Sequence, residues 1–133
     1  MKVKKVNRYS CDFCKKRTFT AHSMRKHEEH CTMNPDRKCG MCRYADHDQP
    51  VLKDLIVVLP VEGSNYEWFG EAVNDALPKL REAAANCPAC IMAALRQAKI
   101  PVPMVDDFKF KDECEAFLAE HSSEDGQYYR EAL

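Results

Sequence analysis

The chain has 133 residues and a mass of 15.3 kDa, enough for one ordinary domain or two small ones. Hydrophobic residues make up 45% and charged residues 31% of it, a composition that excludes a disordered or fibrous protein. The longest apolar stretch, Leu55–Val61, has seven residues and includes a proline, so no membrane helix is predicted. No apolar segment follows the N-terminal lysines, which predicts a cytoplasmic protein without a signal peptide.

Charge is distributed unevenly along the chain. Through Tyr44 there are twelve Lys and Arg and four Asp and Glu, which gives a net charge of +8. From Ala45 onward there are eight Lys and Arg and seventeen Asp and Glu, which gives a net charge of −9. A basic segment can follow the phosphates of a nucleic acid, and an acidic one repels them. The alternative is that these charges only solvate two small modules. We expect a basic module over residues 1–35 and an acidic body over residues 36–133.

The cysteines predict metal sites. Six of the eight form three Cys-x-x-Cys pairs, namely Cys11/Cys14, Cys39/Cys42 and Cys87/Cys90. Without an export signal, a reducing compartment disfavours disulfides. Two sulfurs at this spacing can bind one tetrahedral zinc ion from a tight turn. A thioredoxin-like redox pair is the alternative, but it expects a single motif in a βαβ context.

The first module contains the pattern Tyr9-x-Cys11-x2-Cys14-x12-His27-x3-Cys31. This pattern resembles the zinc finger with a Cys-Cys-His-His ligand set, in the variant whose last ligand is cysteine. The resemblance implies a ββα-like fold that binds zinc through these three cysteines and His27. On a helix over residues 21–29, His27 and Cys31 lie one turn apart and face the same way. His30 competes for the fourth position, because its spacing from His27 is also geometrically possible.

Two further features of the finger bear on its fold. Met24 occupies the position of the family's core leucine, but Phe19 lies five residues after Cys14 instead of four. This departure implies a shift of register in the turn before the helix. A segment this short cannot bury enough apolar area to fold alone, so metal binding supplies the missing stabilisation.

The resemblance also implies where nucleic acid would contact the finger. Base-reading positions fall at Thr20, His22, Ser23 and Lys26. Phosphate contacts would come from Lys15, Lys16, Arg17 and Arg25. The alternative for His22 is a plain solvent-facing residue. One finger spans about three base pairs, which is too few for a specific site, so a sequence-specific transcription factor is not expected.

The other two pairs, Cys39/Cys42 and Cys87/Cys90, are separated by 44 residues. Gly40 permits the tight turn of a zinc knuckle, and Pro88 suits the first turn of a helix. A knuckle combined with the start of a helix resembles the treble-clef or zinc-ribbon arrangement. We predict one four-cysteine zinc site that joins the two pairs. The alternative is two separate sites shared with His47 or with a partner chain.

The rest of the body is predicted to be helical, so the fold class is mainly α with a small β-hairpin. Apolar spacing favours a helix over residues 52–59, although a strand would also fit, and a long amphipathic helix over residues 68–80 that Pro78 divides or kinks. A helix follows Cys90, and residues 100–103 form an extended linker. In a last helix, Lys111–Glu120, Cys114 is expected to be a buried core thiol. Tyr128 and Tyr129 form a candidate docking pair in the tail.

No enzyme is predicted. An HNH-type nuclease needs further histidines between its cysteine pairs, and only His47 lies between Cys42 and Cys87. Cys114 and His121 are seven residues apart rather than one helical turn, which disfavours a Cys/His hydrolase. The few glycines form no phosphate-binding loop, and zinc held by four protein ligands has no position for catalytic water.

The layout also resembles small uncharacterised zinc-finger proteins of tailed bacteriophages. The similar segments are His30–Pro35, Cys39–Cys42 and Cys87–Met92. The resemblance implies an accessory protein of the host cytoplasm, and the two ligand sets imply two zinc ions. Two functions are in question. One is a protein-interaction adaptor on host or phage machinery, and the other is a zinc-dependent nucleic-acid binder with little sequence specificity.

Overall fold

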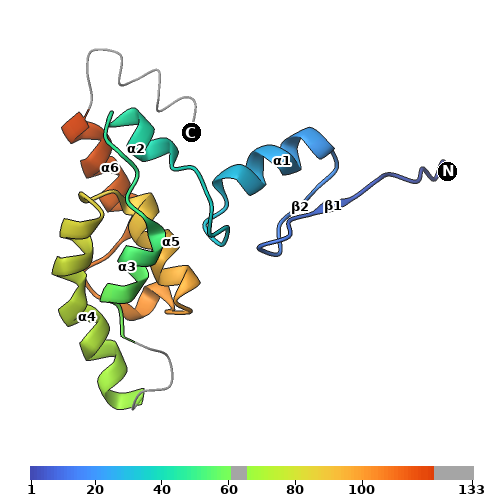
Figure 1. The fold of residues 1–133 in the computed structure, drawn as a ribbon. Coiled ribbons are helices and arrows are strands. Elements are labelled where there is room, and N and C mark those ends of the chain that lie inside the picture. The colour runs from blue at the N-terminus through green and yellow to red at the C-terminus, as the bar shows by residue number, and fades with distance from the viewer. Residues whose placement is uncertain (61–65, 122–133) are drawn as a thin grey trace.

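The structure is a computed structural model that describes residues 1–60 and 66–121. In chain order its elements are β1 (Tyr9–Ser10), β2 (Arg17–Thr18), α1 (Ala21–His30), α2 (Gly40–Tyr44), α3 (Leu52–Val58), α4 (Tyr66–Ala83), α5 (Pro88–Gln97), a 3₁₀ turn η1 (Val102–Met104) and α6 (Phe110–His121). Figure 1 shows the hairpin and α1 extending to one side of the helices α2–α6. The fold is therefore mainly helical with one small hairpin, as predicted.

The hairpin and α1 form the finger. β1 and β2 pair antiparallel, with Tyr9 opposite Thr18. The helix begins after Thr20, whose hydroxyl oxygen accepts a hydrogen bond from the amide of Ser23 at 3.2 Å, a normal N-cap. The buried interior of this module is small and consists of Cys11, Met24 and Cys31. Because so little apolar surface is buried, a metal ion held by the finger would supply stability that this small core lacks.

Phe19 does not belong to this interior. It lies between β2 and the N-cap of α1, and 67% of its surface is exposed. Met24 fills the core instead, as expected for that position. The extra residue after Cys14 thus moves the aromatic ring out of the finger core rather than changing the register of the helix.

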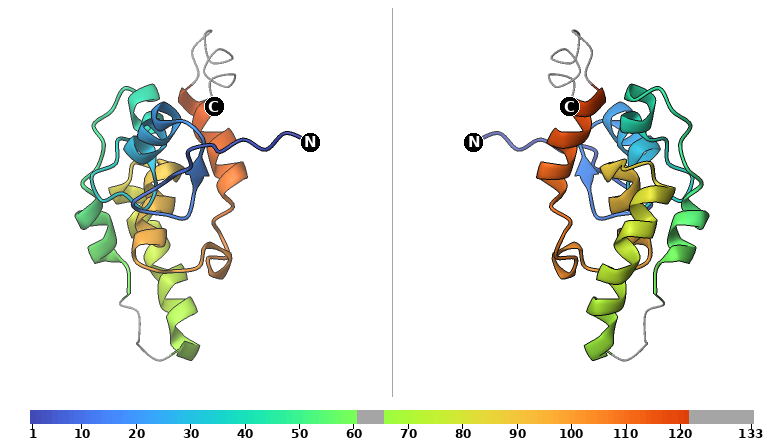
Figure 2. Two further views of the ribbon diagram at one scale, coloured as in Figure 1. Left: turned by 90° about the vertical axis from the view of Figure 1, so that its right-hand side faces the viewer. Right: turned by 90° about the vertical axis from the view of Figure 1, so that its left-hand side faces the viewer.

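The body is built around α5. Its buried residues include Ile91, Ala94 and Leu95, which are fully inaccessible to solvent. α5 contacts α3 and α6, and α4 packs on α3. Figure 2 shows α5 lying between α3 and α6. The predicted helix over residues 52–59 is confirmed as α3, which contributes the buried Leu55 to this core.

Of the two predictions for Pro78, a divided helix or a kinked one, the divided helix is wrong. Pro78 lies inside α4, which runs as one element over its 18 residues. An internal proline removes one backbone donor and costs about 3 kcal/mol. Val73, Leu77 and Leu80 are buried on both sides of it. Burial of each such side chain stabilises by roughly 1.5–3 kcal/mol, which outweighs the break.

The extended linker predicted over residues 100–103 is also only partly correct. Pro101 is extended, but Val102–Met104 form the 3₁₀ turn η1. The amide of Met104 donates to the carbonyl oxygen of Pro101 at 3.0 Å. The fixed backbone angle of proline suits such a turn as well as an extended chain.

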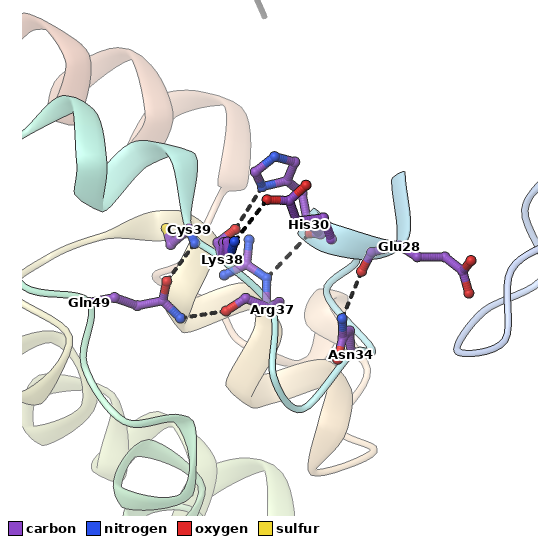
Figure 3. Close-up of polar contacts among 8 residues, drawn as sticks. Glu28, His30, Asn34, Arg37, Lys38, Cys39 and Gln49 are labelled. Atoms are coloured by element: carbon purple, nitrogen blue, oxygen red, sulfur yellow. Dashed lines mark hydrogen bonds and ion pairs between the residues drawn. The ribbon is translucent and has the colours of Figure 1, made fainter. Parts of the chain in front are cut away.

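The segment after α1 folds back on that helix. The amide side chain of Asn34 donates to the carbonyl oxygen of Glu28 at 2.7 Å (Figure 3). The backbone amide of Lys38 donates to the carbonyl oxygen of Glu29 at 2.9 Å. These bonds satisfy carbonyl groups that the end of a helix leaves without partners. The finger is therefore continued by an ordered connection to the first cysteine of the body.

The same segment is held by α5. Gln97 donates through Nε2 to the carbonyl oxygens of Thr32 and Asn34, at 2.8 and 3.0 Å. Arg96 donates through Nη1 to the hydroxyl of Thr32 at 2.9 Å. The finger is thus attached to the body by side-chain contacts in addition to the chain itself.

Candidate metal centres

The first group of ligands lies in the finger. Cys11 and Cys14 are in the loop between the strands, His27 is in α1 and Cys31 is its C-cap. The Sγ atoms of Cys11 and Cys31 are 3.9 Å apart, and Cys14 Sγ is 3.2 Å from Nε2 of His27. All four ligating atoms lie within 4.8 Å of one another. A tetrahedral ion with bonds near 2.3 Å holds its sulfurs about 3.8 Å apart, so the group fits a metal ion.

The fourth donor of this group is Cys31 and not His30. The chain turns out of α1 at Cys31, which directs its sulfur toward Cys11. His30 is exposed, and its Nδ1 lies 2.8 Å from the carbonyl oxygen of Lys38 (Figure 3). His30, which the spacing also allowed as the fourth ligand, is thus held away from the site by the segment after α1.

Backbone amides support the charged sulfurs of the finger. The amide of Phe13 donates to Cys11 Sγ at 3.3 Å, and that of Lys16 donates to Cys14 Sγ at 3.4 Å. Burial acts to raise the pKa of Cys14, but the Lys16 amide and the neighbouring sulfurs outweigh it, so this pKa lies below its ordinary value. The loop therefore stabilises the thiolate, the form of cysteine that binds a metal.

The other donors of this group respond to burial in different ways. Burial lowers the pKa of His27, and the positive charge of Lys16 lowers it further. This favours the neutral imidazole, which is the ligating form. Burial raises the pKa of Cys31 to about 11, so this sulfur ionises readily only beside a cation.

The second group joins the N-termini of two helices. Cys39 is the N-cap of α2 and Cys87 is the N-cap of α5, and each second cysteine, Cys42 or Cys90, lies three residues further, in the first turn. The Sγ atoms of Cys39 and Cys87 are 3.5 Å apart, as are those of Cys42 and Cys90. All four sulfurs lie within 4.8 Å of one another and are buried. The two pairs thus occupy equivalent positions on their helices.

The electrostatics of this group would favour a bound cation. Hydrogen bonds from Cys42, Cys87 and Cys90 hold the pKa of Cys39 below its ordinary value, and the pKa of Cys90 is raised by its three neighbours. Four buried sulfurs in contact cannot all ionise without a positive charge among them. The partial positive charge at each helix N-terminus contributes part of it. The donor set, four thiolates in tetrahedral contact, is typical of zinc or iron–sulfur centres.

Gln49 is a supporting residue that no sequence motif indicated. Its Oε1 accepts a hydrogen bond from the amide of Cys39, and its Nε2 donates to the carbonyl oxygen of Arg37 at 2.7 Å (Figure 3). It therefore fixes the backbone on which the first cysteine of the group stands. A lone glutamine in a loop gives no periodic or spacing signal from which this role could be predicted.

His47 lies beside the second group without joining it. Its amide donates to the carbonyl oxygen of Cys42 at 3.2 Å, while its ring lies 6.1 Å from the rings of both Phe117 and His121. The ring is therefore part of the packing between α6 and the segment after α2. The alternative in which His47 shares a metal with one cysteine pair does not match this placement.

Cys114 also lies outside both groups, as predicted, but it is half-buried and not fully buried. It packs at the margin of the body core from α6. Burial raises its pKa to about 11, so it remains a neutral thiol at ordinary pH.

The candidate nucleic-acid residues are all exposed on the finger. They lie in the loop before β2, on β2 and on the solvent side of α1, and they are Lys15, Lys16, Arg17, His22, Ser23, Arg25 and Lys26. Over residues 1–60 and 66–121, none of the five cationic side chains among them forms an ion pair. The finger thus presents positive charge that the described part of the chain does not neutralise.

Comparison with family models, curated proteins and solved structures finds no match. None of the described helices has the length and apolar character required to cross a membrane. The predicted docking pair Tyr128 and Tyr129 lies outside the described residues. The chemistry of the ligand groups and the surface of the described residues are therefore the basis for the function.

Proposed function

We propose that the chain binds two structural zinc ions and that its finger contacts nucleic acid with little sequence specificity. Zinc accounts for both donor sets, because it accepts three cysteines with one histidine as readily as four cysteines. Each group already supplies four protein donors. No position is then left for a catalytic water, which supports a non-enzymatic role.

The observation that carries the nucleic-acid proposal is the unneutralised charge of the finger. Nine Lys and Arg occur from Lys2 to Lys26, against a single acidic residue, Asp12, in the same stretch. Cationic side chains that neutralise phosphates release condensed counterions, which drives binding without reading bases. One finger spans about three base pairs, so this binding would tolerate many sequences.

A salt titration tests the proposal on the zinc-loaded full chain. We expect a mixed-sequence duplex to shift at low salt and to be released as salt rises. Replacement of Lys15, Lys16 and Arg17 by Glu should abolish the shift, and each lost phosphate contact lowers the salt slope by about 0.9. The matched control replaces three exposed lysines of the body, Lys53, Lys79 and Lys109, by Glu. Absence of binding by the wild-type chain at low salt would end the nucleic-acid proposal.

A second candidate function is the protein-interaction adaptor on host or phage machinery. It is favoured by a groove of about 600 Å³ where the segment after the finger meets α5. Nothing in the zinc chemistry requires such a groove, although it adjoins the finger ligands: Met33 packs against the cluster that contains Cys11 and Cys31, and the charge of Arg96 acts on Cys14. The two candidates are compatible, because they use different surfaces.

A further inference from the structure

The groove between the finger and the body has an apolar floor and a cationic rim. Met33, Met92, Ile100 and Val102 line it together with two prolines, and Arg96 and Lys99 complete it. It is an open depression with a volume of about 600 Å³, large enough for one or two side chains of a partner to rest on. Methionine side chains adapt to partners of varied shape, which suits a protein-binding surface.

The groove forms only where the segment after α1 packs against α5. Met33 comes from the segment that follows α1, whereas the other lining residues belong to α5 and the chain after it. Gln97 holds this segment through the carbonyl oxygens of Thr32 and Asn34. The site is thus assembled from both parts of the molecule and would lose the wall formed by Met33 if they separated.

The charge at the rim is opposite to that of the surrounding body. Arg96 and Lys99 are both exposed, and neither is in an ion pair within residues 1–60 and 66–121. No acidic residue lines the groove. Arg96 uses one N–H toward Thr32, and a guanidinium has five such donors, so several can face a ligand. In the part of the chain from Ala45 onward, which has a net charge of −9, this is a local site for carboxylates.

We propose that the groove binds an extended peptide segment of a partner protein, with one or two large aliphatic side chains flanked by Asp or Glu. This inference deepens the adaptor candidate and rests on it. The aliphatic side chain fills the floor, and the acidic neighbours pair with Arg96 and Lys99. Nucleic acid fits less well, because no aromatic ring lines the groove for a base to stack on and the floor is apolar.

A random twelve-residue peptide library, selected on the zinc-loaded full chain, tests this proposal. The enriched peptides are synthesised with a fluorescent label and titrated by anisotropy. We expect them to combine Leu, Ile or Met with Asp or Glu, and to bind with micromolar affinity because the contact area is small. The amide chemical shifts of Lys99, Ile100 and Val102 should move on binding.

Lys99→Glu is the main variant, since no interaction holds this side chain in the described part of the chain and the fold should be unaffected. It should weaken the selected peptides about fivefold, because it replaces an attraction at the rim by a repulsion. Lys79→Glu, an equal change of charge on the exposed side of α4, is the matched control and should leave them unchanged. Met92→Ala tests the floor and should weaken the same peptides, with the melting temperature as a check on folding.

Each remaining outcome decides against the proposal in a recognisable way. Enriched peptides that bind the Lys99→Glu and Lys79→Glu variants equally well would support the adaptor candidate but refute the groove as the peptide-binding site. If no peptide is enriched, both the adaptor candidate and the groove fail. If the enriched peptides are basic, the charge argument is wrong. The last outcome is that a mixed-sequence oligonucleotide displaces the selected peptides, with Lys99→Glu weakening peptide and oligonucleotide equally. That result would assign the groove to the nucleic-acid surface.

Discussion

The two ligand groups solve different folding problems. Those of the finger lie within the 21 residues from Cys11 to Cys31 and form most of its buried interior themselves. The ligands of the body form two pairs separated by 44 residues. Among the described residues, they belong to a buried core of twenty residues. The comparison teaches that a bound metal ion would replace a hydrophobic core in the finger, whereas in the body it would join two helix N-termini within a core that already exists.

Loss of a finger ligand should have the largest effect. Metal binding supplies roughly 10–16 kcal/mol to a finger of this kind, so Cys14→Ser or Cys31→Ala should unfold residues 9–31. Native mass spectrometry should then show one zinc ion instead of two, and hydrogen exchange should show protection lost in the finger and kept in α3–α6. His30→Ala is the matched control and should retain two ions. Equal loss of protection over the whole chain would contradict a separate folding role for the finger site.

Cys90→Ser should act on the body and have a smaller effect. It leaves three buried sulfurs without a fourth donor but leaves the apolar core in place, so we expect a loss of roughly 3–5 kcal/mol and weaker protection of α2 and α5. Chemical denaturation followed by circular dichroism measures this loss. Cys114→Ser, which changes a half-buried thiol outside both groups, should retain two ions and nearly wild-type stability. A stable Cys90→Ser chain that keeps two tightly bound ions would refute the four-cysteine site.

An ion pair between α4 and α6 stabilises the body without depending on a metal ion. Arg81 in α4 donates to the carboxylate of Glu113 in α6 and to the carbonyl oxygen of Asp107. The Glu113 hydrogen bond and charge raise the pKa of Arg81, although burial opposes them. Arg81→Gln should lower the stability of the body by about 1–2 kcal/mol, measured by thermal unfolding, without change in metal content. Lys79→Gln on the same helix should have no measurable effect.

The smallest effect is expected at Phe19. Because its ring is largely exposed, Phe19→Ala should change the stability and the zinc affinity of the finger by no more than about 0.5 kcal/mol. Met24→Ala, by contrast, removes a buried side chain and should weaken zinc binding measurably, since folding and metal binding are coupled. A chelator competition titration compares the two. Equal losses would mean that the aromatic ring contributes to the finger core after all.

Spacing was sufficient to predict both ligand groups and most helices. Cysteine pairs and the x12 and x3 intervals are local constraints, and a tetrahedral ion accepts few alternatives to them. The amphipathic pattern of α3 is likewise local and predicted its helix. The division of the helix at Pro78 could not be excluded from local sequence, because the packing of Val73, Leu77 and Leu80 against distant residues outweighs one missing hydrogen bond.

Contacts between distant parts of the chain could not be predicted. The hydrogen bonds of Gln49 to the residues beside the four-cysteine site, and those of Gln97 to the segment after α1, join residues 10 to 65 positions apart. Neither glutamine lies in a sequence motif or periodic pattern that indicates its hydrogen-bond partner. The exclusion of His30 from the finger site has the same origin, since it depends on a carbonyl oxygen eight residues away.

The separation of the two cysteine pairs of the body has a consequence for synthesis on the ribosome. Cys42 completes the first pair 48 residues before Cys90 leaves the exit tunnel, whereas the finger has all its donors by Cys31. At elongation rates of about 5–20 residues per second, a nascent chain would carry an already closed finger beside a half-complete pair of thiols for roughly 2–10 s. During that interval the pair is open to oxidation or to a wrongly chosen metal, and only the arrival of α5 ends the exposure.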